Sequence, residues 1–359
     1  MKKAYLLLEN GMVFEGLGFG ACETRIGEAV FTTGMTGCTE SLSDPSYHGQ
    51  IIIFTFPMLG NYGISHADME SGGIHARGVI VREVCEIPSN FRSDESADRF
   101  LKRCGVPGIA GIDTRFLTQL IRDQGVMNAM ITSSAPEGGV PPELKAYRVA
   151  SAVESVSPKS VSRSEPDGRE TFSVALMDYG AKKSLTDSLL SRGCRVTRYP
   201  YDTPASVILA AGHHGVMLSD GPGDPADNPR CIEQIKELMG RLPMFGIGLG
   251  HQMMARAVGG GTVKMKFGHR GANQPVKDLE TGRVLVTSQN HGYVVDGKSL
   301  PPEARLRYVN VNDGTCEGVD YPSHSAFSLQ FCPEGRGGPP DCEGPFDRFI
   351  SQMGGRGHA

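Results

Sequence analysis

The chain has 359 residues, of which 39% are hydrophobic and 21% charged, and its 36 Lys plus Arg against 40 Asp plus Glu give a formal net charge of -4. This balance leaves no basic surface to track phosphates and argues against nucleic acid as a partner, while the ordinary globular composition excludes disordered and fibrous classes. At about 150 residues per domain, the length predicts two domains that each bury a core.

The first domain, residues 1–150, is predicted to be rich in loops and to contain β-structure. Strands are expected at residues 4–8, 12–15 and 51–54. One helix has clear boundaries, since Asp113 can cap its start and Gly125 can end it. Between them Leu117, Leu120 and Ile121 have helical spacing and predict one buried face.

Residues 151–170 are rich in Ser, Pro and charge and show no apolar period, which predicts an interdomain linker. From residue 171 to 359 short apolar strands alternate with amphipathic helices, a pattern typical of an α/β domain with a doubly wound, mostly parallel sheet. Strands are expected at residues 172–177, 194–199, 216–219 and 244–247. Helices are expected at residues 181–191, 231–239 and 253–258.

The compartment follows from what the sequence lacks. No apolar run approaches the roughly 18 residues that a membrane-spanning helix needs, and the Asn10-Gly11 turn comes too early for a signal peptide. The nine cysteines form no CxxC pair and no zinc spacing. We therefore expect a cytoplasmic protein without membrane contact, with reduced and mostly buried thiols and no metal site.

Two loops are predicted to face one crevice. Ligands of open parallel sheets bind beyond the carboxyl ends of the strands, which places residues 220–224 and 246–252 together. The segment at 243–252, PMFGIGLGHQ, has the strand, sharp turn and helix of a nucleophile elbow, with Gly248 at its apex. On spacing alone, a plain tight connection between strand and helix is the favoured interpretation of the segment.

Longer segments narrow this choice. GIGLGHQ, SDGPGDP, VKMKFGHRGANQPVKD, SQNHGY and FCPEG resemble the class I glutamine amidotransferase domain. The segments GMTGCTESLSDPSYHGQ, SNFRS and GIDTRFLTQLIRDQG resemble the N-terminal part of the carbamoyl phosphate synthetase small-subunit family. The match runs in order from about residue 4 to residue 349. The resemblance implies a small-subunit domain at 1–150 and an amidotransferase-like domain at 171–359.

The resemblance implies a glutamine site with an altered catalytic triad. The glutamine-contact positions of the family correspond here to Ser46, Gly221, Gly223, Leu249, Gln252, Asn290, Gly292 and Tyr293. The nucleophilic cysteine of the family corresponds to Gly248, and the general-base histidine corresponds to Cys332. The orienting carboxylate alone is kept, as Glu334.

These substitutions remove the chemistry. Amide hydrolysis by this route needs a thiolate that forms a thioester and an imidazole that carries the proton to the departing ammonia. Gly248 has no side chain, and Glu334 is left with no imidazole to orient. The glycine is nevertheless expected to suit the turn, because it adopts without cost a conformation that strains other residues. We expect the glutaminase step to be lost or severely weakened.

Alternatives remain open at this point. Cys332 is a candidate displaced nucleophile with His291 as its base, or the chain binds glutamine without cleaving it. His251, just after the elbow, is expected to be a packing histidine rather than a catalytic one. The run with Lys264, Lys266, His269 and Arg270 is either a solvated edge or part of a surface near the large subunit.

Cofactors and partners follow from the resemblance. No GxxxxGK[ST] phosphate loop occurs, and in the family ATP and Mg²⁺ are used by a large subunit, so no cofactor is expected in this chain. The implied partners are that large subunit and L-glutamine. The implied product, carbamoyl phosphate, feeds pyrimidine or arginine biosynthesis.

Overall fold

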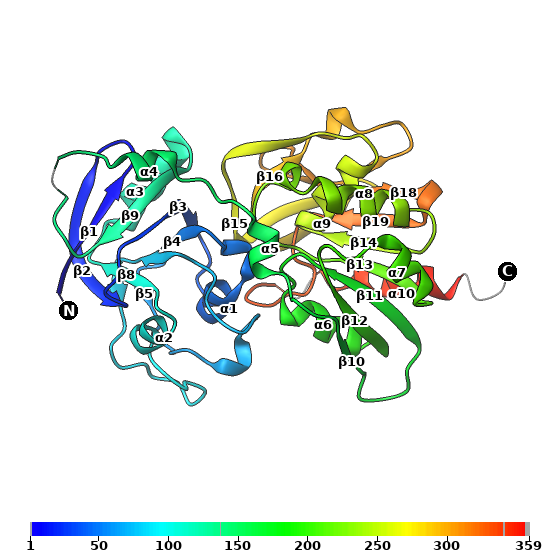
Figure 1. Cartoon of the computed structure of the whole chain (residues 1–359), viewed down its shortest axis with the longest axis horizontal. Helices are drawn as coiled ribbons and strands as arrows, with labels where there is room; N and C mark the ends of the chain where they lie inside the picture. Colours follow the sequence, from blue (N-terminus) through cyan, green and yellow to red (C-terminus); the bar gives the residue numbers. More distant parts are fainter. Residues whose placement is uncertain (1, 137, 340–341, 356–359) are drawn as a thin grey trace. The chain divides into compact units, whose positions relative to one another are not determined.

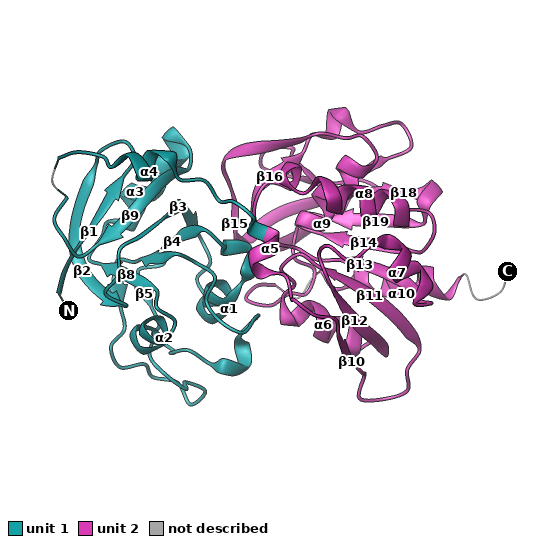
Figure 2. Cartoon of the chain, in the orientation of Figure 1, with its two compact units in different colours: residues 1–152 teal, residues 153–359 magenta. Residues whose placement is uncertain are grey.

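The computed structural model describes residues 2–136, 138–339 and 342–355 (Figure 1). The chain divides into two compact units, residues 1–152 and 153–359 (Figure 2). Each unit has a hydrophobic core of its own. Among the described helices, none has both the length and the apolar character needed to cross a membrane.

The strands of the first unit close into a barrel in the order β1-β2-β8-β6-β4-β3-β9. Their bounds are β1 Lys2–Leu8, β2 Val13–Gly20, β3 Arg25–Thr32, β4 Gln50–Phe54, β6 Gly78–Ile80, β8 Pro107–Ala110 and β9 Met127–Thr132. A separate parallel pair joins β5 Met58–Leu59 to β7 Glu83–Val84. The unit contains more strands than its sequence predicts. Strands β6 and β8 are not expected from the sequence, because they contain Gly and Pro, which ordinarily indicate turns.

The helices of the first unit are short and lie between the strands. They are α1 Cys38–Ser43, α2 Ala97–Arg103, α3 Thr114–Gln124 and α4 Pro142–Ala146. The helix predicted after Asp113 is confirmed as α3, since the Asp113 side chain accepts a hydrogen bond from the Phe116 amide at 3.0 Å. Its buried face contains Leu117 and Ile121, and Gly125 ends it with φ 96°.

The second unit is built on one twisted sheet with strand order β10-β12-β11-β13-β14-β19-β18-β17-β15-β16. The strands are β10 Ser162–Ser164, β11 Phe172–Asp178, β12 Cys194–Pro200, β13 Gly215–Leu218, β14 Met244–Ile247, β15 Thr262–Asp278, β16 Val284–Val295, β17 Arg305–Asn310, β18 Cys316–Tyr321 and β19 Ala326–Leu329. Strands β12, β11, β13, β14 and β19 run parallel to one another. The predicted α/β class is confirmed, with the parallel part limited to these strands.

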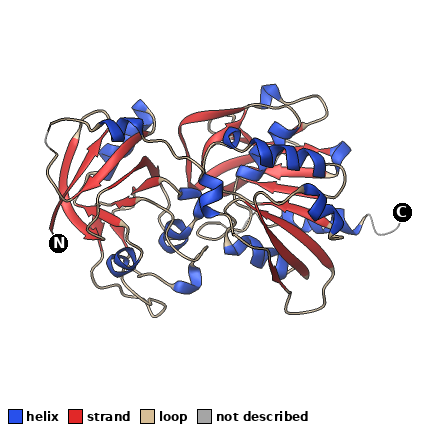
Figure 3. Cartoon of the chain, viewed as in Figure 1, coloured by secondary structure: helices blue, strands red, loops and turns tan. Residues whose placement is uncertain are grey.

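Helices cover both faces of this sheet (Figure 3). They are α5 Ala152–Val156, α6 Lys183–Leu190, α7 Ala205–Ala210, α8 Pro229–Leu238, α9 Leu249–Ala257 and α10 Gly344–Gly354. Alternate residues of β11 separate the two faces: Ala175 and Met177 pack with α7, α8 and α9, whereas Val174 and Leu176 pack with α6 and α10. Strands β11, β13, β14 and β19 are buried on both faces, which explains their mostly apolar sequence.

The remaining strands extend the sheet in an antiparallel arrangement. The long strands β15 and β16 pair with each other, and β15 also pairs with β17. The β15–β16 register shifts twice, between Lys264 and His269 and between Gly271 and Gln274. These irregularities interrupt the alternation of polar and apolar residues, so the sequence does not predict the strands.

Two predicted segments differ in detail. The predicted linker, residues 151–170, contains α5 and also β10, which pairs antiparallel with the edge strand β12. The helix expected at 253–258 begins earlier, at Leu249. Its first turn includes Gly250, a weak helix former, but the Gly250 amide bonds the Ser219 carbonyl at 3.0 Å, so tertiary contacts fix the start.

Candidate functional site

Gly248 forms a sharp turn between β14 and α9. Its backbone has φ 53° and ψ -111°, a conformation that side-chain-bearing residues rarely adopt. The Gly248 amide donates to the Leu329 carbonyl at 2.9 Å, which ties the turn to the end of β19. The strand, sharp turn and helix have the backbone arrangement of a nucleophile elbow, and the helix start directs amides toward the apex. The apex itself carries no reactive atom.

Asp220 lies directly over this apex. A Cβ atom placed on Gly248 would be 2.9 Å from the Cβ of Asp220, closer than real side chains approach. Asp220 follows β13, and its side chain is buried. The turn has therefore closed around a glycine, and any side chain at position 248 requires Asp220 to shift.

The loops after β11, β13, β14 and β19 all leave the same edge of the sheet, as the crevice rule predicts. They bring Lys182, Asp220, Gly248 and Cys332 into one neighbourhood. The Cys332 amide also donates to the Ser288 carbonyl at 2.9 Å, which attaches this loop to β16.

Lys182 occupies the centre of the site. Its ammonium nitrogen donates to the Cys332 sulfur at 3.0 Å and lies 3.2 Å from Asp220 Oδ2. It also forms an ion pair with Glu334 Oε1. All three partners are buried or half-buried, and we call Lys182, Asp220, Cys332 and Glu334 the elbow cluster. Glu334, which the sequence leaves with nothing to orient, is thus paired with a lysine.

The Cys332 thiol is poorly suited to attack a carbonyl group. Burial raises the pKa of Cys332 well above its usual value, and the carboxylates of Glu334 and Asp220 raise it further, against the opposing effect of Lys182. The thiolate is the nucleophilic form of cysteine, so this environment suppresses it at neutral pH.

Neither candidate histidine reaches Cys332. His251 is buried and bonds Ser328 Oγ through Nδ1 at 2.7 Å, and burial lowers the pKa of His251 to about 3. The ring of His291 faces the Tyr293 carbonyl at 2.8 Å and Gln289 Oε1 at 2.9 Å. Within the described residues, no hydrogen bond joins either histidine to the Cys332 sulfur. His251 is a packing histidine, as the sequence predicts.

The glutamine-contact positions of the second unit surround the same turn. Gly221 approaches the loop after β11 so closely that a Cβ on it would lie 2.3 Å from the Tyr179 carbonyl oxygen. Leu249 is the first residue of α9, and Gln252 donates from Nε2 to the Tyr293 carbonyl at 2.8 Å. The others are Gly223 in the loop after β13, and Asn290, Gly292 and Tyr293 on β16.

Ser46 belongs to the first unit. It lies in a short 3-10 helix, Pro45–Tyr47, and its amide donates to Asp44 Oδ1 at 2.8 Å. This Asx-type turn fixes the backbone on both sides of Ser46.

The basic run on β15 is split between two environments. Lys264 and Lys266 are exposed, whereas His269 and Arg270 are buried. Arg270 donates from Nη1 to the Phe267 carbonyl at 2.8 Å. The run is therefore not a uniformly solvated edge.

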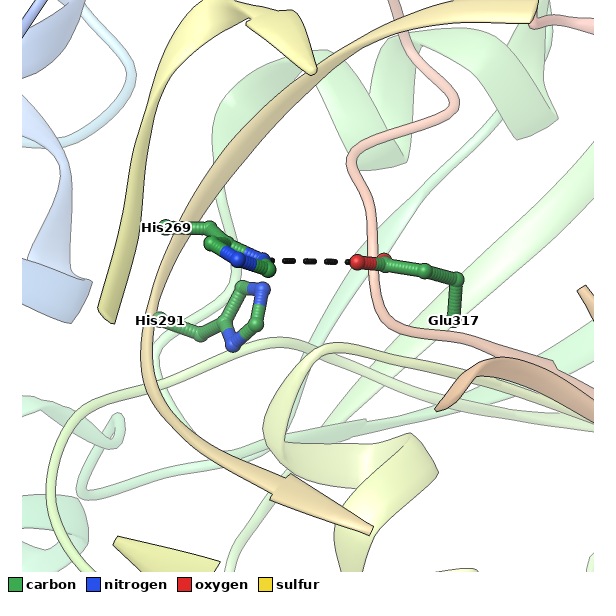
Figure 4. Close-up of side chains that lie close together, drawn as sticks. All are labelled: His269, His291 and Glu317. Atoms are coloured by element: carbon green, nitrogen blue, oxygen red, sulfur yellow. Dashed lines mark ion pairs between the residues drawn. The ribbon is translucent and has the colours of Figure 1, made fainter. Parts of the chain in front are cut away.

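His269 is part of a second buried group of titratable side chains, with His291 and Glu317, which we call the strand cluster (Figure 4). His269 and His291 are register partners across β15 and β16, and their rings lie 5.1 Å apart. Glu317 comes from β18, and its Oε1 is 3.4 Å from His269 Nδ1. The sequence does not predict this grouping, because its members lie on three strands and match no motif.

The charges of the strand cluster influence one another. Burial lowers the pKa of His269, but Glu317 and Asp313 outweigh it and raise that pKa above its usual value. Burial raises the pKa of Glu317. For His291, burial and the neighbouring His269 lower the pKa well below its usual value.

Two groups of side chains thus have the composition of metal ligands: Asp220, Cys332 and Glu334, and the strand cluster. In the elbow cluster the Lys182 ammonium already lies among the three donors, where a metal cation would otherwise sit. The described residues of the strand cluster contain no comparable lysine or arginine contact to Glu317.

Comparison with known proteins gives consistent matches over both units. Residues 6–131 match the family model "Carbamoyl-phosphate synthase small chain, CPSase domain", and residues 175–352 match "Glutamine amidotransferase class-I". The chain is 46% identical to the carbamoyl phosphate synthase small chain of Listeria monocytogenes serotype 4b, covering 99% of this chain and 98% of that protein. It is also 46% identical to the small chains of Bacillus cereus and Fusobacterium nucleatum, each over 98% of this chain and 96% and 99% of theirs.

Proposed function

The chain belongs to the family of carbamoyl phosphate synthase small chains, and on that premise we propose that it is a small subunit whose own glutaminase step is lost or severely weakened. In this proposal a large-subunit partner carries the ATP and Mg²⁺ sites and makes carbamoyl phosphate from bicarbonate, ATP and free ammonia in the cytoplasm. The present chain then serves as a structural and regulatory partner.

The observation that carries the proposal is the glycine at the elbow apex. Hydrolysis of glutamine by this family's route begins when a sulfur attacks the side-chain carbonyl carbon, and it ends when water cleaves the thioester. Gly248 offers no atom for the first bond. Other hydrolases without their triad keep a factor of about 10³ to 10⁴ over water from binding and oxyanion stabilisation, and we expect no more here.

The surroundings of Cys332 support the same proposal. A proton-carrying imidazole is replaced by a thiol whose contact is the Lys182 ammonium, and an ammonium ion has no lone pair with which to accept a proton. A glutaminase rearranged around Cys332 would need both a thiolate and a nearby base. The high pKa of Cys332 and the other contacts of His291 argue against that alternative.

Binding of glutamine without cleavage is favoured by a separate observation. The glutamine-contact positions are largely backbone features, such as the close approach of Gly221 to Tyr179 and the first turn of α9, and these do not depend on the triad. Calorimetric titration of the purified chain with glutamine tests this role. An absence of heat at millimolar glutamine would exclude it.

The main test uses the chain assembled with its large subunit. We expect carbamoyl phosphate synthesis with ammonium chloride and none above background with glutamine. If carbamoyl phosphate formed as fast with glutamine as with ammonium chloride, the proposal would be rejected. Treatment with a glutamine-mimicking electrophile and peptide mass spectrometry then examines Cys332 directly, with exposed Cys22 as the reactive control. Label on Cys332 that glutamine suppresses would support the rearranged site instead.

A further inference from the structure

The strand cluster has the ligands and the geometry of a metal centre, and it shares no residue with the elbow cluster. We propose that His269, His291 and Glu317 bind one divalent transition-metal ion of the zinc class. Two imidazoles and one carboxylate are a common protein ligand set for such ions. The proposal concerns a different site from the elbow cluster and does not depend on the loss of glutaminase activity.

The distances suit a small cation. One donor atom from each residue lies within 4.8 Å of the other two, and the edge between His269 Nδ1 and Glu317 Oε1 is 3.4 Å. The edge of a tetrahedral zinc site with bonds near 2.0–2.1 Å is about 3.4 Å. All three side chains are buried, and Glu317 has no exposed surface. Figure 4 shows the two rings and the carboxylate converging from different strands.

Each ligand also has the outer partner that metal ligands require. His269 presents Nε2 to Asp313 Oδ2 at 2.9 Å, which leaves Nδ1 directed at Glu317. His291 presents Nδ1 to the Tyr293 carbonyl at 2.8 Å. Glu317 accepts from Gln289 Nε2 at 2.9 Å. Carboxylate or carbonyl acceptors behind each histidine fix the ring and the tautomer that binds metal.

Both ring nitrogens of His291 face oxygen atoms, and a bound cation would make this arrangement favourable. Gln289 uses its amide nitrogen for Glu317 and for Thr287 Oγ1, at 2.9 and 3.1 Å, so its oxygen faces His291 Nε2 at 2.9 Å. A neutral imidazole has only one N–H and faces two oxygen acceptors here. Whichever tautomer forms, one nitrogen lone pair opposes an oxygen. A metal ion bound by Nε2 removes that conflict and makes the Gln289 oxygen a fourth ligand.

The backbone around His269 is built to direct this side chain. Register shifts in the β15–β16 pairing lie on both sides of the paired stretch His269–Gly271, and Gly268 has φ 73°. Bulges of this kind redirect side chains and are frequent beside functional sites. The ion would join β15, β16 and β18, and β16 also carries the glutamine-contact positions Asn290 and Tyr293.

The test is a titration of the purified full-length chain, first dialysed against a chelator. With Zn²⁺ in a calorimeter we expect one equivalent to bind. Co²⁺ should give the visible absorption bands of a four-coordinate nitrogen and oxygen site. A sulfur-to-cobalt charge-transfer band in the near ultraviolet would show that one of the nine cysteines binds the ion and would overturn the proposal, as would an absence of binding at 100-fold molar excess.

Substitutions make the assignment specific. Glu317→Gln should weaken Zn²⁺ binding at least about 100-fold, and Asp313→Asn should weaken it about 10-fold through His269. Asp313 is exposed, so this variant keeps the test valid if Glu317→Gln does not fold. His66→Gln is the matched control, because His66 is an exposed histidine that also contacts a carboxylate, Glu95, at 2.9 Å. Unchanged affinity in Asp313→Asn, or an equal loss in His66→Gln, would refute the site.

Discussion

The elbow cluster and the strand cluster are both buried groups of titratable side chains within the second unit, yet they balance their charge differently. In the elbow cluster two carboxylates and a thiol surround the ammonium of Lys182, so the chain supplies its own cation. In the strand cluster Glu317 faces His269 and two amides, and the cation there is either a proton on His269 or a bound ion.

The difference shows two ways in which buried carboxylates in this unit are compensated. Buried carboxylates are costly without a compensating charge. Glu334 forms an ion pair with Lys182, which comes from the loop after β11 and supplies the compensating charge. The Lys182 ammonium thus balances the charge of the elbow cluster. It contacts Cys332, at the position where glutamine hydrolysis by the family's route needs a proton carrier. Three experiments test this contrast.

The largest effect is expected from rebuilding the triad. The double change Gly248→Cys with Cys332→His should raise glutamine hydrolysis at least about 10³-fold above either single change, because nucleophile and base act as a unit. The gain is limited by the strain of a side chain at φ 53°, about 1–3 kcal/mol, and by the 2.9 Å approach to Asp220. Release of glutamate measures the effect.

The single variants serve as controls in this experiment. Gly248→Cys alone leaves the new thiol without a base, and Cys332→His alone leaves a base without a nucleophile. Equal, additive gains from the two changes would show that they do not share a site, and would contradict the geometry of the elbow cluster.

The second experiment removes the internal cation. Lys182→Met removes the ammonium that lies between the buried carboxylates of Asp220 and Glu334, so the free energy of unfolding in urea should fall by about 3–5 kcal/mol. Adding Glu334→Gln to this variant should restore a substantial part of the lost free energy of unfolding, because it removes one of the two buried negative charges.

Lys183→Met is the matched control for that experiment. Lys183 is the next residue along the chain and also pairs with a carboxylate, Asp187, but on an exposed helix face. Its loss should change stability by less than about 0.5–1 kcal/mol, as for other surface pairs. If both variants lost a similar free energy of unfolding, the buried ammonium of Lys182 would contribute no more to stability than the exposed ammonium of Lys183.

The sequence could predict part of this site and not the rest, for identifiable reasons. The turn at Gly248 has a local signal, since an apolar strand, small residues and a helix follow in order. The resemblance to a family then assigned positions to it. Lys182 has no such signal. It lies about 150 residues from Cys332 and Glu334 in the sequence, and the fold of the sheet brings the three side chains together. The rule that loops at the carboxyl ends of parallel strands converge applies to the loop after β11 too, and could have included it.

The fold follows the same division. Parallel strands such as β11 and β14 are continuous apolar runs, and α3 has a cap, an apolar period and a terminal glycine, so local patterns predict them. The barrel strands β6 and β8 begin with residues that are typical of turns, Gly78 and Pro107. Pairing with neighbouring strands decides their conformation, and that information is not local.

The third experiment concerns a buried histidine beside the elbow whose hydrogen-bond partner is a hydroxyl group and not a carboxylate. His251, beside the elbow, hydrogen-bonds the Ser328 hydroxyl, and burial lowers its pKa to about 3, whereas carboxylates raise the pKa of His269. The pKa of a histidine in the unfolded chain is about 6.5. Between that pH and about 3, position 251 is therefore protonated in the unfolded chain and neutral in the folded chain. Stability should therefore fall as the pH falls from about 6.5 toward 3.

At pH 5 the penalty from His251 is about 2 kcal/mol, from 1.36 kcal/mol for each pH unit below 6.5. Urea unfolding of the wild type and of His251→Asn at pH 7 and pH 5 measures it. The variant loses some stability at both pH values by altered packing, but the difference between the two pH values should shrink by that amount. An unchanged difference would mean that the folded chain protonates His251 without cost, and the ring would then not be the neutral packing group that its contact with Ser328 implies.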